Sequence, residues 1–383
     1  MPSASALVPL WDRSAEWTRR LAMIDAARTF LYLTTFYIEF DAYGGAALAA
    51  LQRAQRRGVQ VTLLIDAFGQ RLGGVLMMTG QRTALARELD VLREAGGRVV
   101  FYAPPFLAQR MLGGGQHVKI QVSEAGEAIF GSGNITRSSF EGWNEFAVAV
   151  QGPVAGVLLE SIRALGGPVE PAHVSHLQRV ASLTAADIAL DYWLCNPNAH
   201  HGWSGPLGWR GRNEVTDRMI EMLDAARDSA RITSFYFKPV EPLLEAVLRA
   251  ARRGVRVEIF HSHRDALPTT DLAWIAAAAS YDRLLEAGVV LYENLHGEHS
   301  KLVVIDEAWA AFGSYNFEDA AHDRLAEGML ASRDPRVVAP LLGIFDELRG
   351  HPDNLRVTSE SFGRLPSWVK ARVARYGRFK WWM

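Results

Sequence analysis

The chain has 383 residues, 49% of them hydrophobic, with 41 basic and 42 acidic residues and a net charge of −1. This length exceeds what a single hydrophobic core usually organises, so we expect two domains. The balanced charge argues against a general nucleic-acid binder. The single cysteine, Cys195, excludes an intramolecular disulfide, and we interpret it as a reduced or buried thiol.

The first part of the chain alternates helical and strand-like patterns. The N-terminal residues have neither a charged segment nor a long apolar core, and no stretch of about eighteen apolar residues occurs, so we expect no signal peptide and no membrane-spanning helix. A helical pattern at residues 21–28 precedes a strand-like run at 30–38. The next helical pattern ends at Arg56-Arg57-Gly58, where the glycine is typical of a helix C-terminus. A strand at 60–65 and a helix near 82–95 are predicted to follow.

Two apolar segments, at residues 72–78 and 104–108, interrupt this series, and we expect both to be loops. Because residues 105–112 run directly up to the first motif, they are predicted to lie at the mouth of a site. Apolar side chains there would suit acyl chains or insertion into a lipid leaflet, whereas a nuclease should carry Lys and Arg. Burial in ordinary packing is the alternative interpretation.

A polar cluster at residues 117–145 recurs, 182 residues later, at 299–327. The first copy consists of His117, Lys119, Glu124, Ser132, Asn134 and Glu145, and the second of His299, Lys301, Asp306, Ser314, Asn316 and Glu327. A single His-x-Lys is usually a solvated strand face, but the whole pattern is not expected twice by chance. The duplication therefore predicts that two halves of the molecule contribute to one site.

The residue types in each cluster suit a phosphodiester. Residues two apart on a strand share a face, so each copy can offer an imidazole, an ammonium, a hydroxyl and a carboxamide to one point. Lys and Asn, together with Ser132 and Ser314, would bind the phosphate, one His would attack phosphorus, and the other would protonate the leaving oxygen. Glu145 and Glu327 could each accept a hydrogen bond from Nδ1 of the histidine in their own half.

Residues 166–211 break the pattern with several prolines and glycines, which predicts a linker with a short helix near 175–183. The aromatic residues of segment 191–194, with Trp203 and Trp209, could line the substrate entrance or pack the linker onto the lobes. Two pairs of histidines, one at residues 200–201 and one formed by His261 and His263, could suggest a metal site. Ordinary loop or strand-end histidines are the simpler interpretation.

The second half repeats the first. A helical pattern at 219–227, a strand at 231–237, a helix ending at Arg252-Arg253-Gly254, a strand at 256–260 and a helix near 271–287 precede the second motif. This alternation predicts an α/β sandwich with a largely buried mixed sheet in each half. The repeat predicts a pseudo-twofold axis with the site on it.

The C-terminal residues 364–383 contain six basic and no acidic residues. Aromatic residues are interleaved with them at Trp368, Tyr376, Phe379, Trp381 and Trp382. This composition suits contact with an anionic membrane surface. A tail folded on the protein, a solvated end, or a grip on single-stranded nucleic acid are the alternatives.

The pattern His-x-Lys-x4-Asp-x6-Gly-Ser-x-Asn resembles the signature of the phospholipase D superfamily. The second cluster matches it at every position, and the first departs only at Glu124. The segments 30–70, 143–153 and 231–263 look like those of bacterial cardiolipin synthases, and the resemblance covers most of residues 15–350. It implies two phospholipase D-type lobes with the active site at their interface: residues 1–166, a linker at 167–211, a second lobe at 212–352 and a basic aromatic tail at 353–383.

The resemblance also implies a ping-pong reaction with a phosphohistidine intermediate. It makes His117 the nucleophile and His299 the general acid and then base. Lys119, Lys301, Asn134 and Asn316 match the phosphate-binding positions. Glu145 and Glu327 match positions that orient the histidines, while Asp306 and Glu124 match a supporting position. No metal or other cofactor is expected.

We therefore expect a phosphatidyltransferase similar to cardiolipin synthase, acting on a phospholipid. A hydrolase of the same superfamily, either a phospholipase or a nuclease, is the alternative, and a binding protein with a disabled site is a third. The resemblance and the tail together predict a cytoplasmic protein held peripherally at the inner membrane. Nucleic acid is not an expected partner, and the sequence makes no prediction about oligomeric state.

Overall fold

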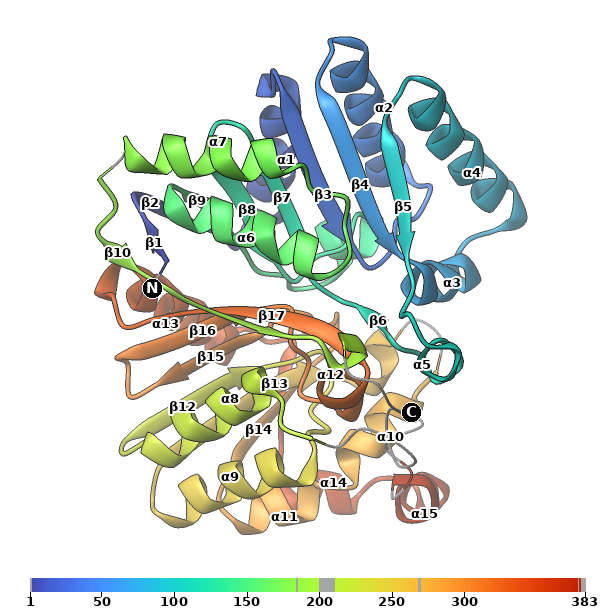
Figure 1. Ribbon diagram of the computed structural model, residues 1–383. Coiled ribbons are helices and arrows are strands. Elements are labelled where there is room, and N and C mark those ends of the chain that lie inside the picture. The colour runs from blue at the N-terminus through green and yellow to red at the C-terminus, as the bar shows by residue number, and fades with distance from the viewer. Residues whose placement is uncertain (1, 184, 200–210, 268–269, 378, 380–383) are drawn as a thin grey trace.

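The structure is a computed structural model that describes residues 2–183, 185–199, 211–267, 270–377 and 379. Two mixed sheets lie one above the other, and helices cover them (Figure 1). We name the parts built on these sheets the N-terminal lobe and the C-terminal lobe. The elements of the N-terminal lobe and the connection that follows it are β1 (Ser3–Ala4), β2 (Ala6–Leu10), α1 (Arg13–Ala26), β3 (Phe30–Thr35), α2 (Ala42–Arg56), β4 (Gln60–Asp66), α3 (Ala67–Leu76), α4 (Thr79–Glu94), β5 (Arg98–Tyr102), α5 (Leu107–Met111), β6 (Gly115–Gln116), β7 (Lys119–Ser123), β8 (Glu127–Gly131), the π-helical turn η1 (Ser138–Gly142), β9 (Ala147–Gln151), α6 (Pro153–Ala164), α7 (Pro171–Ser182), β10 (Ile188–Ala189) and the 3-10 turn η2 (Pro197–Ala199).

The C-terminal lobe begins with a strand that precedes the turn η2. Its elements are β11 (Asp191–Cys195), α8 (Glu214–Ala225), β12 (Ser229–Thr233), α9 (Glu241–Arg252), β13 (Arg256–Ser262), the 3-10 turn η4 (Arg264–Ala266), α10 (Leu272–Ala278), α11 (Tyr281–Glu286), β14 (Val290–Asn294), β15 (Leu302–Ile305), β16 (Trp309–Gly313), α12 (Asp319–Asp323), β17 (Leu325–Ser332), α13 (Pro335–Gly350), β18 (Asn354–Val357), α14 (Ser359–Gly363) and α15 (Ser367–Tyr376).

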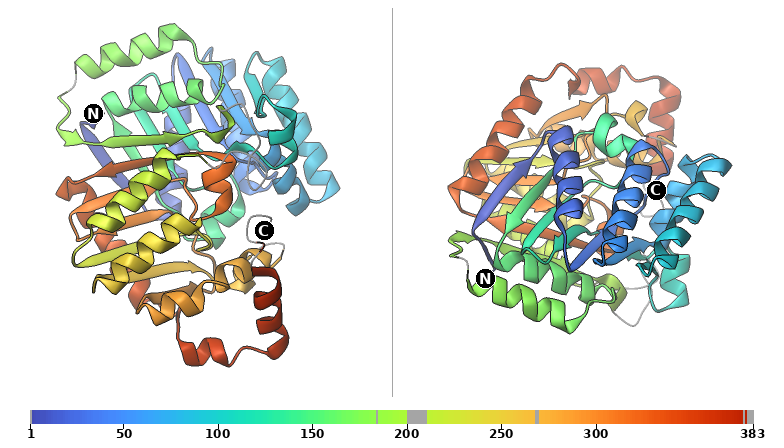
Figure 2. Two further views of the ribbon diagram at one scale, coloured as in Figure 1. Left: turned by 60° about the horizontal axis from the view of Figure 1, so that its bottom comes forward. Right: turned by 90° about the horizontal axis from the view of Figure 1, so that it is seen from above.

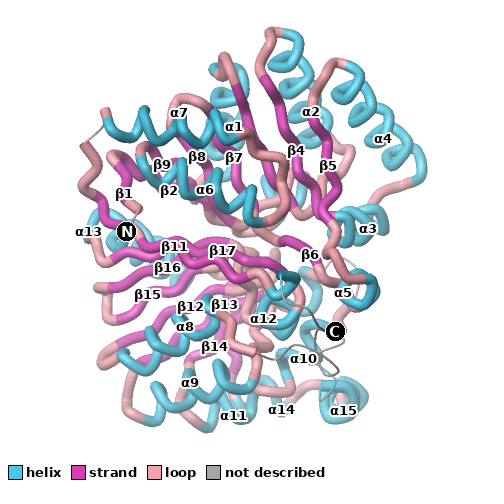
Figure 3. Tube along the Cα trace, viewed as in Figure 1, coloured by secondary structure: helices cyan, strands magenta, loops and turns pink. Residues whose placement is uncertain are grey.

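The two sheets have the same topology. Strand order is β2-β9-β8-β7-β3-β4-β5 in the first and β11-β17-β16-β15-β12-β13-β14-β18 in the second, where β18 extends the edge. Figure 3 shows the strands of both sheets in magenta. In each sheet three strands pair in parallel, β3-β4-β5 and β12-β13-β14, and the motif strands pair antiparallel beside them. The predicted α/β class and internal repeat are confirmed. The predicted helix ends are also confirmed, since α2 and α9 stop before Gly58 and Gly254, both of which have φ of +93°.

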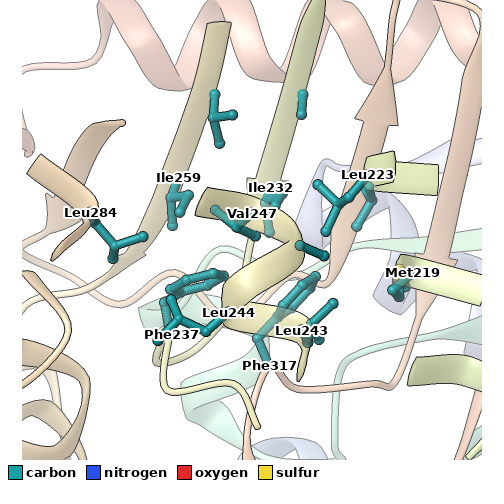
Figure 4. Close-up of a cluster of buried hydrophobic side chains, with 14 of the residues drawn as sticks. Met219, Leu223, Ile232, Phe237, Leu243, Leu244, Val247, Ile259, Leu284 and Phe317 are labelled. Carbon is teal, nitrogen blue, oxygen red and sulfur yellow. The ribbon is translucent and has the colours of Figure 1, made fainter. Parts of the chain in front are cut away.

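Each sheet is buried on both faces, which explains why its strands read as nearly continuous apolar runs. In the N-terminal lobe, α1, α2 and α4 cover one face. In the C-terminal lobe, α8, α9 and α11 do the same, with side chains such as Leu223, Leu244 and Ile259 packed between helix and strand (Figure 4). The opposite faces share one cluster that runs from α6 and α7 through both sheets to α13. The lobes are therefore joined by apolar packing.

Two sequence interpretations are refined by the structure. The segment assigned to a linker supplies α7, packed on α6, and β11, which pairs with β17 as the edge strand of the second sheet. The Trp193 side chain of β11 is buried in the C-terminal core and does not line an entrance. Residues 203 and 209 lie outside the described part of the chain, and so do residues 200 and 201.

The C-terminal segment folds on the protein as far as residue 377. Helix α15 packs against α10, beside the C-terminal lobe (Figure 2). Arg372 donates two hydrogen bonds of 2.7 Å to the carboxylate of Asp271, and Val369 and Val373 join the C-terminal core. The residues 378 and 380–383 lie outside the described part of the chain. Among the described residues, no helix is both long enough and apolar enough to cross a lipid bilayer.

Candidate active site

Both motif histidines line one cavity of about 440 Å³ between the lobes. Asn134 and Asn316 line it as well. The structure therefore brings together the residues that the two halves were predicted to contribute to one site. His117 and His299 are both buried, and so are the two motif lysines, Lys119 and Lys301.

The two glutamates pair with the histidines crosswise. His117 Nδ1 lies 3.0 Å from Glu327 Oε1, and His299 Nδ1 lies 2.9 Å from Glu145 Oε2. The prediction that each glutamate serves the histidine of its own half is therefore wrong. Each His–Glu pair takes one member from each lobe, so neither lobe holds a complete pair.

Backbone pairing between the lobes explains this exchange. The His117 amide donates to the carbonyl of Ala326, and the His299 amide donates to the carbonyl of Asn144, both at 2.8 Å. The strand β6 that leads into His117 pairs in parallel with the start of β17, and Glu298 forms the matching bridge with Asn144. Because Glu145 and Glu327 follow these carbonyls directly, each carboxylate reaches the histidine of the opposite lobe.

Aromatic side chains hold both imidazoles from the side. Phe36 packs its edge against His117 at 4.8 Å, and Phe235 packs against His299 at 4.6 Å between ring centroids. The His299 ring also stacks on Trp143 at 5.0 Å. The sequence alone did not predict these three aromatic residues as site components. The matching runs Thr34–Tyr37 and Thr233–Tyr236, offset by 199 residues, could have identified the two phenylalanines.

The motif lysines bond to the backbone of their own histidines. Lys119 Nζ donates to the His117 carbonyl at 2.7 Å, and Lys301 Nζ donates to the His299 carbonyl and lies 3.0 Å from His299 Nδ1. Their charges act on both histidines, because each lysine lowers the pKa of His117 and of His299. Neither lysine lines the cavity itself, and burial lowers the pKa of Lys301 to about 8 and that of Lys119 well below its ordinary value. Ammonium groups directly behind the histidines suit a bound phosphate, whose charge would stabilise them.

Ser132 and Ser314 are placed differently from the prediction that they bind phosphate. Their hydroxyls donate to the carboxylates of Glu145 and Glu327, respectively, and neither residue lines the cavity. The reason is that β8 ends at Gly131 and β16 ends at Gly313. The alternation of faces that would align Ser with Asn stops with the strand.

Asp306 and Glu124 lie outside the cavity, at the far ends of the motif strands. Asp306 accepts hydrogen bonds from the amides of Arg227, Asp228 and Ser229 and so fastens β15 to the start of β12. Glu124 makes one such bond, from the amide of Arg28, and its Oε2 is buried without a partner among the described residues. With Glu in place of Asp, the first copy therefore has fewer hydrogen bonds between the end of its motif strand and the neighbouring strand. The cavity is not affected.

Burial and neighbouring charges make the two His–Glu pairs unequal. Burial raises the pKa of Glu327 to about 8, against the lowering effect of Lys119. Burial acts on Glu145 in the same sense, but the His299 ring and the Lys301 ammonium hold its pKa at about 2. Burial lowers the pKa of His299 to about 3 and that of His117 well below its usual range. Both shifts favour the neutral form of the imidazole.

The rim of the cavity is apolar and comes from both lobes. Helix α3 contributes Leu72, Val75 and Leu76, and the segment around α10 contributes Leu267 and Leu272. The apolar segment at 72–78 was expected to be a loop but is mostly helix. The segment at 105–112 does not line this cavity: Pro104 and Arg110 line a neighbouring hollow of about 430 Å³ on the other side of α3.

The described residues contain no group of three His, Cys, Asp or Glu side chains arranged to hold a metal ion. His261 instead lies 2.8 Å from the Tyr281 hydroxyl in a buried network with Glu293. Cys195 is buried, and burial raises the pKa of its thiol to about 12. Neither residue lines the cavity between the lobes.

Two lobes of one topology, each supplying a His-x-Lys motif to a shared cavity, define an enzyme of the phospholipase D superfamily. Residues 21–163 and 219–349 match the family model for cardiolipin synthase, PLD-like domain, and the chain belongs to this family. Cardiolipin synthase B of Salmonella typhi is 27% identical over 316 residues, which cover 77% of this chain and 68% of that protein. Cardiolipin synthase B of Escherichia coli K12 is 26% identical over 314 residues, with the same two coverages.

The crystal structure of phosphatidylserine synthase from Haemophilus influenzae Rd KW20 has the same fold. It aligns with a TM-score of 0.73 at 15% sequence identity, covering 99% of this chain and 95% of that one. Together with the family match, these relatives support a phosphatidyltransferase of the phospholipase D superfamily.

Proposed function

We propose that the chain transfers a phosphatidyl group from one phospholipid to an alcohol, as a cardiolipin synthase does, through a phosphohistidine at His117. The observation that carries this proposal is the composition of the cavity. His117 and His299 line it beside two amides, and apolar side chains from α3 and α10 form its rim. A phosphodiester with acyl chains matches both parts of this lining.

In the first step, His117 Nε2 attacks phosphorus and a nitrogen–phosphorus bond forms. The bond from phosphorus to the leaving alcohol breaks, and the proton on His299 moves to the leaving oxygen. In the second step, the acceptor alcohol attacks phosphorus and gives its proton to His299, and the nitrogen–phosphorus bond breaks. The glycerol head of phosphatidylglycerol is the proposed acceptor. Lys119, Lys301, Asn134 and Asn316 would bind the non-bridging oxygens.

The different pKa values of Glu145 and Glu327 support this division of roles between the histidines. A general acid must carry a proton, and an ionised partner on its other nitrogen stabilises that state. Glu145, whose pKa is held at about 2, is such a partner for His299. The pKa of Glu327 is raised to about 8, which favours a neutral imidazole at His117. His117 Nδ1 also lies 3.2 Å from the Ser314 carbonyl, which can accept the Nδ1 proton and leave Nε2 free to attack. A bound phosphate would counter the lysine charges that lower the pKa of His299.

Hydrolysis is the second candidate, because water could replace the alcohol at the same intermediate. Incubation with phosphatidylglycerol, with and without added alcohol and in the presence of chelator, distinguishes the candidates. Cardiolipin and glycerol as products would support transfer, and phosphatidic acid would indicate a phospholipase. Cleavage of DNA with no lipid product would contradict both lipid assignments.

We further propose that the protein binds an anionic leaflet through a surface beside the cavity mouth. This rim surface comprises the exposed apolar residues Leu72, Val75, Met78, Leu107 and Met111, together with Arg71 and Arg110 and the exposed residues Trp368, Lys370 and Arg375 of α15. Helices α3, α5, α10 and α15 lie on one side of the molecule in two views (Figures 1 and 2). Apolar and basic side chains together suit an anionic membrane, and a lipid could enter the cavity from there.

Vesicle flotation tests the rim surface. The double variant Leu107→Glu and Met111→Glu should lose binding to phosphatidylglycerol vesicles but still cleave a water-soluble diester, because neither residue lines the cavity. Leu183→Glu is the matched control, since Leu183 is 88% exposed and directly follows α7, which lies on the opposite side of the molecule in Figure 1. Unchanged flotation of the double variant, or equal loss in the control, would contradict the proposed membrane surface.

A further inference from the structure

The two His–Glu pairs differ by one buried hydroxyl. Glu145 Oε2 contacts His299 and the Ser132 hydroxyl, and Glu145 Oε1 accepts a further hydrogen bond of 2.8 Å from Ser139 Oγ. Glu327 has the corresponding contacts with His117 and Ser314. The residue 182 positions after Ser139 is Ala321, whose methyl group cannot donate a hydrogen bond.

Ser139 is held so that its proton points at Glu145. The Asn134 amide and the Thr136 hydroxyl both donate to Ser139 Oγ, at 3.1 and 3.3 Å. These bonds occupy the acceptor side of the hydroxyl, which leaves its single hydrogen for the carboxylate. Ser139 lies in the π-helical turn η1 and is completely buried. The donor is therefore fixed in the folded protein.

We propose that Ser139 is the positioning residue that assigns the acid–base role to His299, by holding Glu145 as a carboxylate against His299 Nδ1. This inference rests on the proposed transfer reaction. Three donors on Glu145 stabilise its charge more than two would, and the charge in turn stabilises an imidazolium at His299. Among the residues that the structure describes, no third donor reaches Glu327, and its partner His117 stays neutral.

Charged groups around the pairs add to this difference, because Glu318 raises the pKa of Glu327 and is not among the main groups that act on Glu145. Lys119 and Lys301 act on both histidines and on Glu327, and Lys301 acts on Glu145. Glu318 faces His117 and Glu327, and Tyr37 faces Glu145. Through both chemical steps the proton moves only between His299 Nε2 and the alcohol oxygens, and the Ser139 proton stays on Ser139.

Three variants test the inference. Ser139→Ala removes the donor, Ser139→Cys keeps nearly the same volume with a weaker donor, and Ser138→Ala is the matched control in the same turn. The activity of each is measured on a water-soluble phosphodiester across pH. We expect Ser139→Ala to lower the rate at neutral pH by about tenfold and to move the alkaline limb down by about one pH unit. Ser139→Cys should move that limb in the same direction by less, and Ser138→Ala should not move it.

A second measurement does not depend on turnover. Nitrogen-15 NMR of the histidine side chains, with inorganic phosphate present, reports the pKa of His299 directly. We expect this pKa to be lower in folded Ser139→Ala than in the wild type and in Ser138→Ala. An unchanged His299 pKa in folded Ser139→Ala and Ser139→Cys would overturn the inference, whatever reaction the enzyme catalyses. An altered His299 pKa in an enzyme that forms no transfer product would support it while removing the proposed reaction.

Discussion

The N-terminal and C-terminal lobes share their strand order and motifs but differ at two matched positions, one beside a His–Glu pair and one at the far end of a motif strand. Glu124 stands where the C-terminal lobe has Asp306, and Ser139 where it has Ala321. The change at Ser139 gives Glu145 a hydrogen-bond donor that Ala321 cannot offer to Glu327, and so helps to separate the environments of the two histidines. The change at Glu124 affects only how firmly a motif strand is fastened. The comparison indicates that a repeated fold supplies two histidines, and that a few side chains then give each one its own role.

The His–Glu pairs form between the lobes and not within them. Each imidazole contacts a carboxylate from the opposite lobe. The reason is that the backbone of each motif histidine pairs with the residue that precedes the glutamate of the other lobe. A single lobe therefore holds a histidine without its glutamate. We infer that the relative position of the lobes is part of the catalytic geometry.

The largest effect is expected from removing the proposed nucleophile. His117→Ala should lower lipid turnover by about 10⁴-fold or more, because no phosphohistidine can form. Product analysis by mass spectrometry after incubation with phosphatidylglycerol measures this. Substantial remaining activity, in a variant whose thermal unfolding is unchanged, would reverse the assignment of the two histidines.

The crosswise pairing predicts a specific pattern of double mutants. Glu145→Gln should reduce the rate by about 10³-fold in the wild type and by much less in a His299→Ala background, since the pair is already broken. Glu327→Gln should keep its full effect in that background. Steady-state rates of the single and double variants give the coupling energies. If Glu327→Gln is the silent partner of His299→Ala, the pairing we describe is wrong.

Acid should destabilise the folded protein through the same groups. The folded pKa of His299 is about 3 and its ordinary value is 6.5, so between these values the unfolded chain binds a proton that the folded site does not. The stabilisation is therefore present above pH 6.5 and is lost as the pH falls toward 3. The lowered pKa of Glu145 acts in the same direction between 4.5 and about 2.

Thermal unfolding measured from pH 7 to pH 5 checks this linkage. The unfolding midpoint should fall with pH, and His299→Gln should reduce the slope because the substituted side chain does not titrate. Equal slopes in the wild type and the variant would show that His299 already binds its proton in the folded cavity.

The smallest effect is expected from removing the side-chain hydrogen bonds at the far ends of the motif strands. Asp306→Ala removes the acceptor of three amide hydrogen bonds and should lower the free energy of unfolding by about 1–2 kcal/mol. Glu124→Ala removes the acceptor of one and should cost less than about 1 kcal/mol. Denaturant unfolding of both variants gives the comparison. A larger loss for Glu124→Ala would contradict our account of this difference between the lobes.

The sequence predicted the α/β class, the repeat and the convergence of both motifs, because spacing and apolar pattern along one chain are local information. It did not predict the crosswise pairs. Spacing tells which side chains share a face of a strand, but not which strand of the other lobe lies opposite. The sequence also did not predict that Ser132 and Ser314 lie away from the cavity, because it did not show that β8 and β16 end just before them. Helix α3 was mistaken for a loop because of its glycines, one of which, Gly73, instead gives Tyr37 room to pack closely.

The central claim is that one phosphodiester reacts between two histidines from different lobes, with His117 as the covalent carrier. The direct measurement is to incubate the wild type and His299→Ala with a labelled phosphatidyl nitrophenyl ester, whose leaving group departs without a proton from His299, quench the reaction, and locate the label by peptide mass spectrometry. Our account predicts a labelled peptide containing His117, and no label in His117→Ala. A label on His299 in the wild type, or no protein-bound label under any quench time, would contradict it.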